Sequence, residues 1–223
     1  MKAYIWDLPT RLFHWSLAVL VVAAFITAKI GGNAMIWHGR IGLAIIGLLV
    51  FRIVWGLVGS TYARFFQFVR GPATILAYLR GAWQGQGHNP LGALSVLALL
   101  GILTAQAATG LFANDDIAFE GYLTPLIGSD LSGKLTGIHH LLEKGLMFLV
   151  ALHVGSIVYY ARVKKHNLVK PMINGWADGS PEQSARGGGP LAFIVAALLA
   201  AAMVWIASGA LLPSPPPSAA PLF

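Results

Sequence analysis

Five long apolar segments constrain the fold of this chain more than any other feature. They cover residues 12–30, 36–58, 91–113, 135–161 and 191–212. Each is close to or above the roughly 20 residues that a helix needs to cross the hydrocarbon core of a bilayer. Only 10% of the residues are charged, whereas a soluble domain carries about 25%. The sequence therefore predicts an all-α integral membrane protein, a four-helix bundle followed by a fifth, C-terminal transmembrane helix.

The first apolar segment also has to be weighed as a secretory signal peptide. It is long for the apolar part of a signal peptide, and no A-x-A-like cleavage site follows it. We expect it to stay in the protein as a membrane span.

Charge and composition divide the chain into a four-span module, a linker, a fifth helix and a tail. Residues 1–173 form a four-span module, in which 67–87 suggests an amphipathic helix on the membrane surface. Residues 174–190 are rich in Gly, Ser and Pro and predict a flexible linker. The fifth transmembrane helix, 191–212, contains no ionisable residue, and a Pro-rich tail, 213–223, follows it.

The distribution of Lys and Arg predicts the orientation in the membrane. Ten of them lie before the first segment, between the second and third, and between the fourth and fifth, against four on the other side. The positive-inside rule then places the N-terminus and the linker in the cytoplasm and the tail in the periplasm. The net charge of +7 is explained by this clustering in loops, so we expect no nucleic-acid partner.

Four histidines near the ends of the apolar segments point to bound cofactors. His139 and His153 are fourteen residues apart, so they share one helix face at about four turns' separation, roughly 21 Å. Histidine within a membrane span is costly and usually functional. His14 begins the first segment and His38 begins the second. By depth, His14 pairs with His153 and His38 with His139, which predicts two cofactors stacked across the membrane.

The absence of cysteine narrows the chemistry of those cofactors. It excludes disulfides, iron–sulfur ligation, zinc–thiolate sites and covalent attachment of haem. Each histidine pair could hold one haem iron between two imidazoles, as in electron-transfer haems. A metal-ion transporter is the alternative from another class, although Glu143 is the only carboxylate near the histidines within the spans. Glu143 could tune the nearer haem, carry a proton, or pair with Lys144 or a neighbouring span.

Four stretches resemble one known family. They are WDLPTRLFHW, WHGRIGLAIIGLLVFRIVWGLVGS, GHNPLGALSVLALL and HHLLEKGLMFLVALHVG. Over residues 4–172 the chain is similar to the bacterial cytochrome b561 and nickel–iron hydrogenase b-type cytochrome subunit family. The resemblance implies a four-helix core with two b-type haems in the bacterial inner membrane, so that residues 1–173 would be a dihaem cytochrome b module. It implies the axial ligands His14, His38, His139 and His153. Family members often have Glu directly after the first of the two histidines in the fourth span, where this chain has His140, so His140 is an alternative to His139.

Other residues are candidates for contacts with the cofactors. Haem propionates are commonly held by Arg or Lys, and Arg11, Arg40 and Arg52 lie near the histidines in sequence or depth. His88, at the start of the third span, is a candidate quinone contact. Small residues are needed where a flat macrocycle lies against a helix, and the candidates are Gly39, Gly42, Gly47, Gly137, Gly145 and Gly155.

These observations predict a protein that transfers electrons between the quinone pool and a periplasmic redox partner such as a c-type cytochrome. Whether it acts as a quinone oxidoreductase stays open. An alternative is the membrane-anchoring cytochrome b subunit of a hydrogenase-like periplasmic enzyme, and another is an anchor with structural haems. The expected partners are membrane lipid, a quinone and a periplasmic electron carrier or enzyme subunit, with homo- or hetero-oligomers left open.

Overall fold

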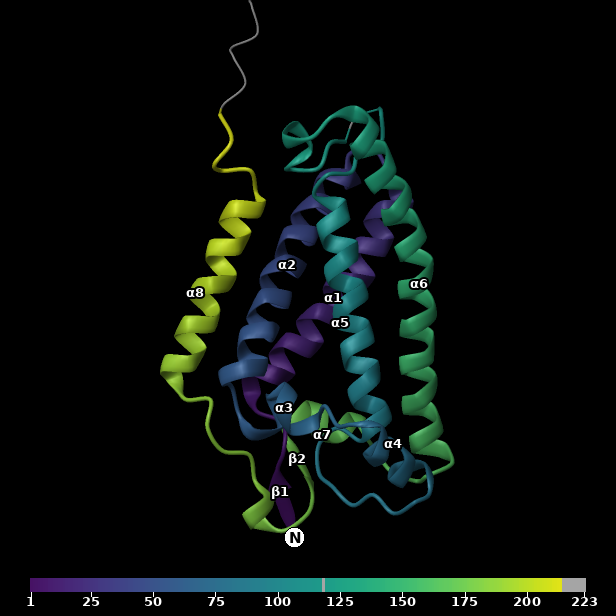
Figure 1. Ribbon diagram of the computed structural model, residues 1–223, viewed down its shortest axis with the longest axis vertical. Coiled ribbons are helices and arrows are strands. Elements are labelled where there is room, and N and C mark those ends of the chain that lie inside the picture. The colour runs from purple at the N-terminus through teal and green to yellow at the C-terminus, as the bar shows by residue number, and fades with distance from the viewer. Residues whose placement is uncertain (118, 214–223) are drawn as a thin grey trace, which may run out of the picture.

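Five long helices dominate the computed structural model, which describes residues 1–117 and 119–213 (Figure 1). They are α1 (Leu8–Ile30), α2 (Ala34–Val58), α5 (Pro90–Gly110), α6 (Ser129–Arg162) and α8 (Pro190–Ala207). All five are long and apolar enough to cross a membrane. The predicted all-α membrane fold with a fifth C-terminal helix is confirmed.

The ends of the helices follow local capping signals. The side chain of Asp7 caps α1 by accepting a hydrogen bond from Thr10 N, and Asn89 caps α5 in the same way from Gly92 N. Helix α6 begins six residues before the apolar segment 135–161, because a polar first turn continues the helix beyond the apolar stretch. Helix α8 ends at Ala207 rather than at 212, and Gly209 follows with a φ of +77°, which a helix cannot continue.

Helix α2 lies at the centre of the packing. It contacts α1, α5 and α8, while α6 packs mainly on α5 at the edge opposite α8 (Figure 1). One buried cluster between the helices consists of Ile45, Leu49, Leu103 and Leu146. Among the described residues, the backbone of α6 makes no comparable contact with α1 or α2. Helix α6 is therefore held to the bundle mainly through α5.

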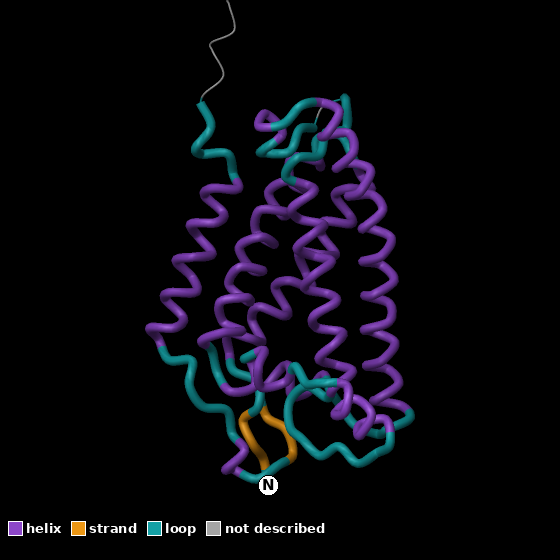
Figure 2. The backbone as a smooth tube through the Cα atoms, viewed as in Figure 1, coloured by secondary structure: helices purple, strands orange, loops and turns teal. Residues whose placement is uncertain are grey.

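Short elements gather at the end of the bundle where the N-terminus lies (Figure 2). Strand β1 (Lys2–Tyr4) pairs antiparallel with β2 (Trp176–Asp178), with Ala3 opposite Ala177. The 3-10 turns η1 (Thr61–Ala63) and η3 (Pro181–Gln183) and the helices α3 (Phe65–Phe68), α4 (Pro72–Leu79) and α7 (Val169–Asn174) complete this end. The surface helix predicted over 67–87 is reduced to α4, because Gly81 ends it with a positive φ. The 3-10 turn η2 (Thr124–Leu126) belongs to the loop at the opposite end.

The segment 174–190, for which the sequence predicts a flexible linker, makes defined contacts with the N-terminal end. Ala185 N donates to Tyr4 O at 2.7 Å, and Thr61 N donates to Arg186 O at 2.9 Å. Its backbone groups are thus satisfied by β1 and by the turn after α2, which sequence composition does not reveal. Of the predicted Pro-rich tail, residues 214–223 lie outside the described residues.

Candidate haem sites

The structure brings the four candidate histidines together in the two pairs expected from depth. His14 of α1 faces His153 of α6, with 6.3 Å between ring centroids. His38 of α2 faces His139 of α6, with 6.2 Å between ring centroids. One helix therefore supplies a histidine to each pair, near opposite ends of the bundle.

These separations fit two imidazoles that share one iron. A metal–imidazole bond of about 2.0–2.1 Å and a ring centre about 1.1 Å behind each nitrogen give ring centres about 6.3 Å apart. Both observed separations agree with this value. The pair of His38 and His139 also lines a cavity, which gives this site room for a flat group. The residues present fit a haem at each pair.

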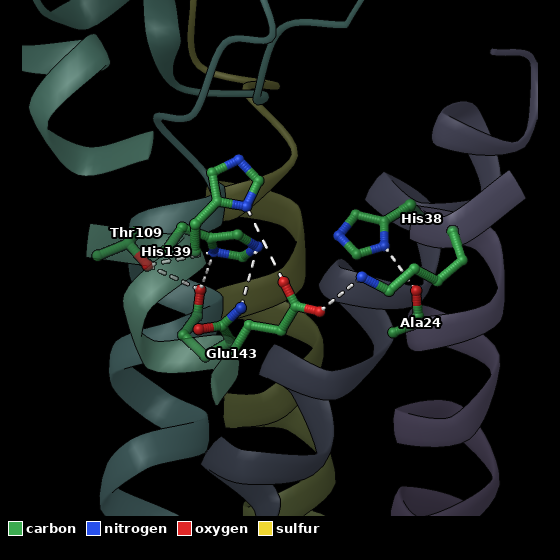
Figure 3. Close-up of polar contacts among 8 residues, drawn as sticks. Ala24, His38, Thr109, His139 and Glu143 are labelled. Atoms are coloured by element: carbon green, nitrogen blue, oxygen red, sulfur yellow. Dashed lines mark hydrogen bonds and ion pairs between the residues drawn. The ribbon is translucent and has the colours of Figure 1, made fainter. Parts of the chain in front are cut away.

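Hydrogen bonds orient the histidine pair at the end opposite the N-terminus (Figure 3). Nδ1 of His38 lies 3.0 Å from Ala24 O, and Nδ1 of His139 lies 2.9 Å from Gln106 O. Because a carbonyl only accepts, each Nδ1 carries the proton and each Nε2 keeps its lone pair. This is the tautomer of a metal-ligating histidine whose second nitrogen bonds to the backbone. The Nε2 lone pair of His139 faces the side-chain amide nitrogen of Gln106 at 3.1 Å, so a metal ion bound to this nitrogen would replace that contact.

A cavity surrounds this second pair and depends on small residues. Both histidines line it, together with Gly39, Gly42 and Gly110. A Cβ on Gly110 would lie 2.9 Å from Cε1 of His139, so only glycine leaves the ring its place. A Cβ on Gly42 would meet nothing within 4 Å, as expected beside an open site.

The other predicted glycines serve different neighbours. A Cβ on Gly47 would lie 2.8 Å from a methyl of Val204, so Gly47 lets α8 approach α2. A Cβ on Gly145 would lie 2.9 Å from Ile102, so Gly145 lets α5 approach α6. Gly137 and Gly155 have open space at this position and are not among the residues that line the cavity.

Near the N-terminal end, aromatic rings enclose His88. Its ring centroid lies 4.7 Å from that of Trp6 and 4.4 Å from that of Phe68. Its Nδ1 is buried and has no hydrogen-bond partner among the described residues. Burial, helped by the nearby charges of Arg52 and His14, lowers the pKa of His88 to about 3. His88 is therefore neutral near pH 7.

Asp7 anchors a buried polar network at the same end, which the sequence did not reveal. Besides Thr10 N at 2.6 Å, its carboxylate accepts hydrogen bonds from Trp55 Nε1 at 3.2 Å and from the Ser60 hydroxyl. Asp7 as a whole residue is only 9% exposed. The position of Asp7 just before a helix start is visible in the sequence, but its partners, about 50 residues away, are not.

The three candidate arginines differ in their surroundings. Arg52 is buried, donates to Ala63 O at 3.1 Å and lies 4.8 Å above the ring of Phe65. Arg40 is exposed and stacks over Trp37 at 5.0 Å. Arg11 donates from Nη1 to a backbone carbonyl of α7, while its Nε is buried without a partner among the described residues. Arg52 is thus the one buried cation of the three.

Glu143 has one ionic partner on a neighbouring helix and one histidine contact on its own helix. Its Oε1 lies 3.3 Å from Nζ of Lys29 in α1, and its Oε2 lies 3.9 Å from Nδ1 of His140. Of the two partners considered from the sequence, a neighbouring span is therefore observed instead of Lys144. The side chain of His140 is largely exposed, while the neighbouring His139 faces His38.

Comparison with known proteins agrees with this arrangement. The profile of the family described as prokaryotic cytochrome b561 matches residues 5–175. A probable Ni/Fe-hydrogenase B-type cytochrome subunit of Azotobacter vinelandii is 25% identical, over 78% of this chain and 87% of that protein. The corresponding protein of Azotobacter chroococcum mcd 1 is 26% identical over the same shares. No solved structure shows a significant match.

The chain belongs to the prokaryotic cytochrome b561 family. It is therefore a b-type cytochrome, an electron-transfer protein that binds haem b and crosses a membrane several times. The predicted family is confirmed. The profile ends before α8, so the fifth helix lies outside the matched region.

Proposed function

We propose that this protein carries electrons across a membrane through two b-type haems. One would lie between His14 and His153, the other between His38 and His139. The observation that carries the proposal is the pair of ring separations, 6.3 and 6.2 Å, on three different helices. When bound, each haem supplies an iron that takes up and releases one electron.

The protein's own groups hold and orient these cofactors. The four histidines would be the axial ligands, and the backbone carbonyls of Ala24 and Gln106 fix the tautomers of His38 and His139. His140 stays an alternative to His139. Its exposure and its contact with Glu143 favour His139.

Arginines are proposed to bind the haem propionates. The buried guanidinium of Arg52 is the best supported, since a buried cation is stabilised by an anionic partner. Arg40 stands two residues after His38, and Arg11 stands three residues before His14. Arg40 would thus serve the haem between His38 and His139, and Arg11 the haem between His14 and His153.

A quinone is the proposed redox substrate at the N-terminal end. His88 supports this, because a neutral imidazole with a free nitrogen among aromatic rings can hydrogen-bond a quinone oxygen. It lies close enough to the first histidine pair for the charge of His14 to influence it. The protein would then act as a quinone oxidoreductase.

The redox partner is proposed to dock at the opposite end of the bundle. A small basic carrier such as a c-type cytochrome would be attracted by the acidic loop between α5 and α6. The names of the two relatives favour instead a hydrogenase-like enzyme that holds the cytochrome as its membrane anchor. A metal-ion transporter is less well supported, because the described residues contain no group of three His, Cys, Asp or Glu side chains placed to hold an ion.

The proposed location is the bacterial inner membrane, with the N-terminus in the cytoplasm and the C-terminus in the periplasm. The basic N-terminal segment and the loops after α2 and α6 lie at one end of the bundle (Figure 1), as the positive-inside rule requires of a cytoplasmic face. The proposed parts of the chain are the dihaem module 1–173, the linker 174–190, the fifth helix and the Pro-rich tail.

Haem content and optical spectra of purified variants test the proposal. The parent protein should bind two haems per chain and show reduced b-type bands. His153→Ala and His139→Ala should each bind about one, and His140→Ala should keep both. Unchanged spectra in the first two variants would refute the ligand assignment, and a loss in the third would transfer the role to His140.

A further inference from the structure

Glu143 is the only acidic residue in the apolar part of α6, and it lies at a proposed haem site. It lines the same cavity as His38 and His139, and Figure 3 shows the ionic contacts that its carboxylate makes beside them. Its side chain is 23% exposed. Acidic side chains within membrane spans are costly, so their positions usually reflect a role.

The partner of Glu143 is placed differently. Lys29, the cation 3.3 Å away, stands at the end of α1, and its side chain is 74% exposed. Solvent and salt screen an exposed charge far more than one that lines a cavity. The positive charge of Lys29 therefore offsets the field of Glu143 inside the cavity only in part.

Two roles are compatible with this ion pair. It could act as a tether, because it links α1 to α6 and the backbones of these two helices make few close contacts. It could also act through its field, because a fixed negative charge beside an iron favours the ferric state, which carries one more positive charge. Exchanging the two charges distinguishes the roles. A tether would work equally well after the exchange, whereas the field at the haem would change sign.

We propose that the negative charge of Glu143 lowers the reduction potential of the haem between His38 and His139, and that the positive charge of Lys29 reduces this effect. The inference rests on the proposed function, since it needs a haem at that pair. The haem between His38 and His139, at the end where the redox partner is proposed to dock, would then favour the oxidised state.

Potentiometric titration of the purified dihaem protein, followed by its optical bands, tests the proposal. Glu143→Gln should raise the potential of one haem and leave the other unchanged. We expect at least a threefold change in the ratio of reduced to oxidised haem at a fixed potential, about 28 mV at 59 mV per tenfold. Lys29→Gln should shift the same haem downward. Asp130→Asn, which neutralises an exposed acid at the start of α6, should shift neither haem.

The exchanged pair, Glu143→Lys with Lys29→Glu, separates the two roles. A field effect predicts a higher potential than in Glu143→Gln, whereas a tether predicts the parent potential. A parental potential in the exchanged pair, or in Glu143→Gln alone, would overturn the proposal. Haem content, measured on the same samples, tests the proposed function separately, because a parent protein without two haems would refute that function before any potential is compared.

Discussion

The carboxylate of Asp7 should contribute more to stability than any exposed carboxylate of this chain. It accepts three hydrogen bonds that join the start of α1 to the end of α2 and to the turn after it. We therefore consider Asp7→Ala, which removes all three acceptor contacts at once.

The magnitude follows from the contacts. Loss of the helix cap costs about 1 kcal/mol. The buried donors of Trp55 and Ser60 lose this acceptor, and an unsatisfied buried donor costs about 1–3 kcal/mol. The free energy of unfolding should thus fall by about 3–7 kcal/mol. Asp7→Asn keeps an acceptor oxygen for the cap and should lose only about 1–3 kcal/mol.

Denaturant titration in mixed micelles, followed by circular dichroism, measures this difference. Asp178→Ala is a matched control, because Asp178 is exposed and should change the free energy of unfolding by about 0.5 kcal/mol at most. If Asp7→Ala unfolds like the control, the buried network does not hold these helices together and the reasoning is refuted.

Three further predictions concern topology, docking and pH. A reporter fused at the C-terminus should be active in the periplasm and one inserted within 174–186 in the cytoplasm; the opposite result at both positions would invert the molecule. Changing Asp115, Asp116 and Glu120 together to their amides should slow electron exchange with a basic carrier at low salt but not at high salt, where exposed charges are screened within roughly 10 Å at 0.1 M. Equal stopped-flow rates at low salt would remove this loop as a docking site. The pKa of His88 is about 3 in the folded state and about 6.5 in the unfolded state. Between these two pH values only the unfolded state binds a proton on His88, so the free energy of unfolding should be highest above pH 6.5 and should fall as the pH decreases toward 3. His88→Gln should reduce the fall in melting temperature between pH 7.5 and pH 5, and an unchanged fall would contradict the assigned pKa.

The sequence by itself was sufficient for properties that belong to single helices. The length of each apolar segment determines that a helix can span a bilayer, whatever its neighbours are. The fourteen-residue spacing of His139 and His153 places both on one face of α6, because the helical period fixes their directions. Depth along the spans then paired these residues with His38 and His14, and the structure has the same pairs.

Only the tertiary structure decided which residues meet across helices. Helical periodicity sets the direction of a side chain relative to its own helix, but not the rotation of that helix or the order of its neighbours. For this reason the contact of Asp7 with Trp55, 48 residues away, could not be predicted. The same holds for the pairing of Glu143 with Lys29 rather than Lys144, and for Gly47, which faces α8 instead of a cofactor. The pairing of β1 with β2 also joins segments that are far apart in the sequence, so it depends on how the helices between them pack.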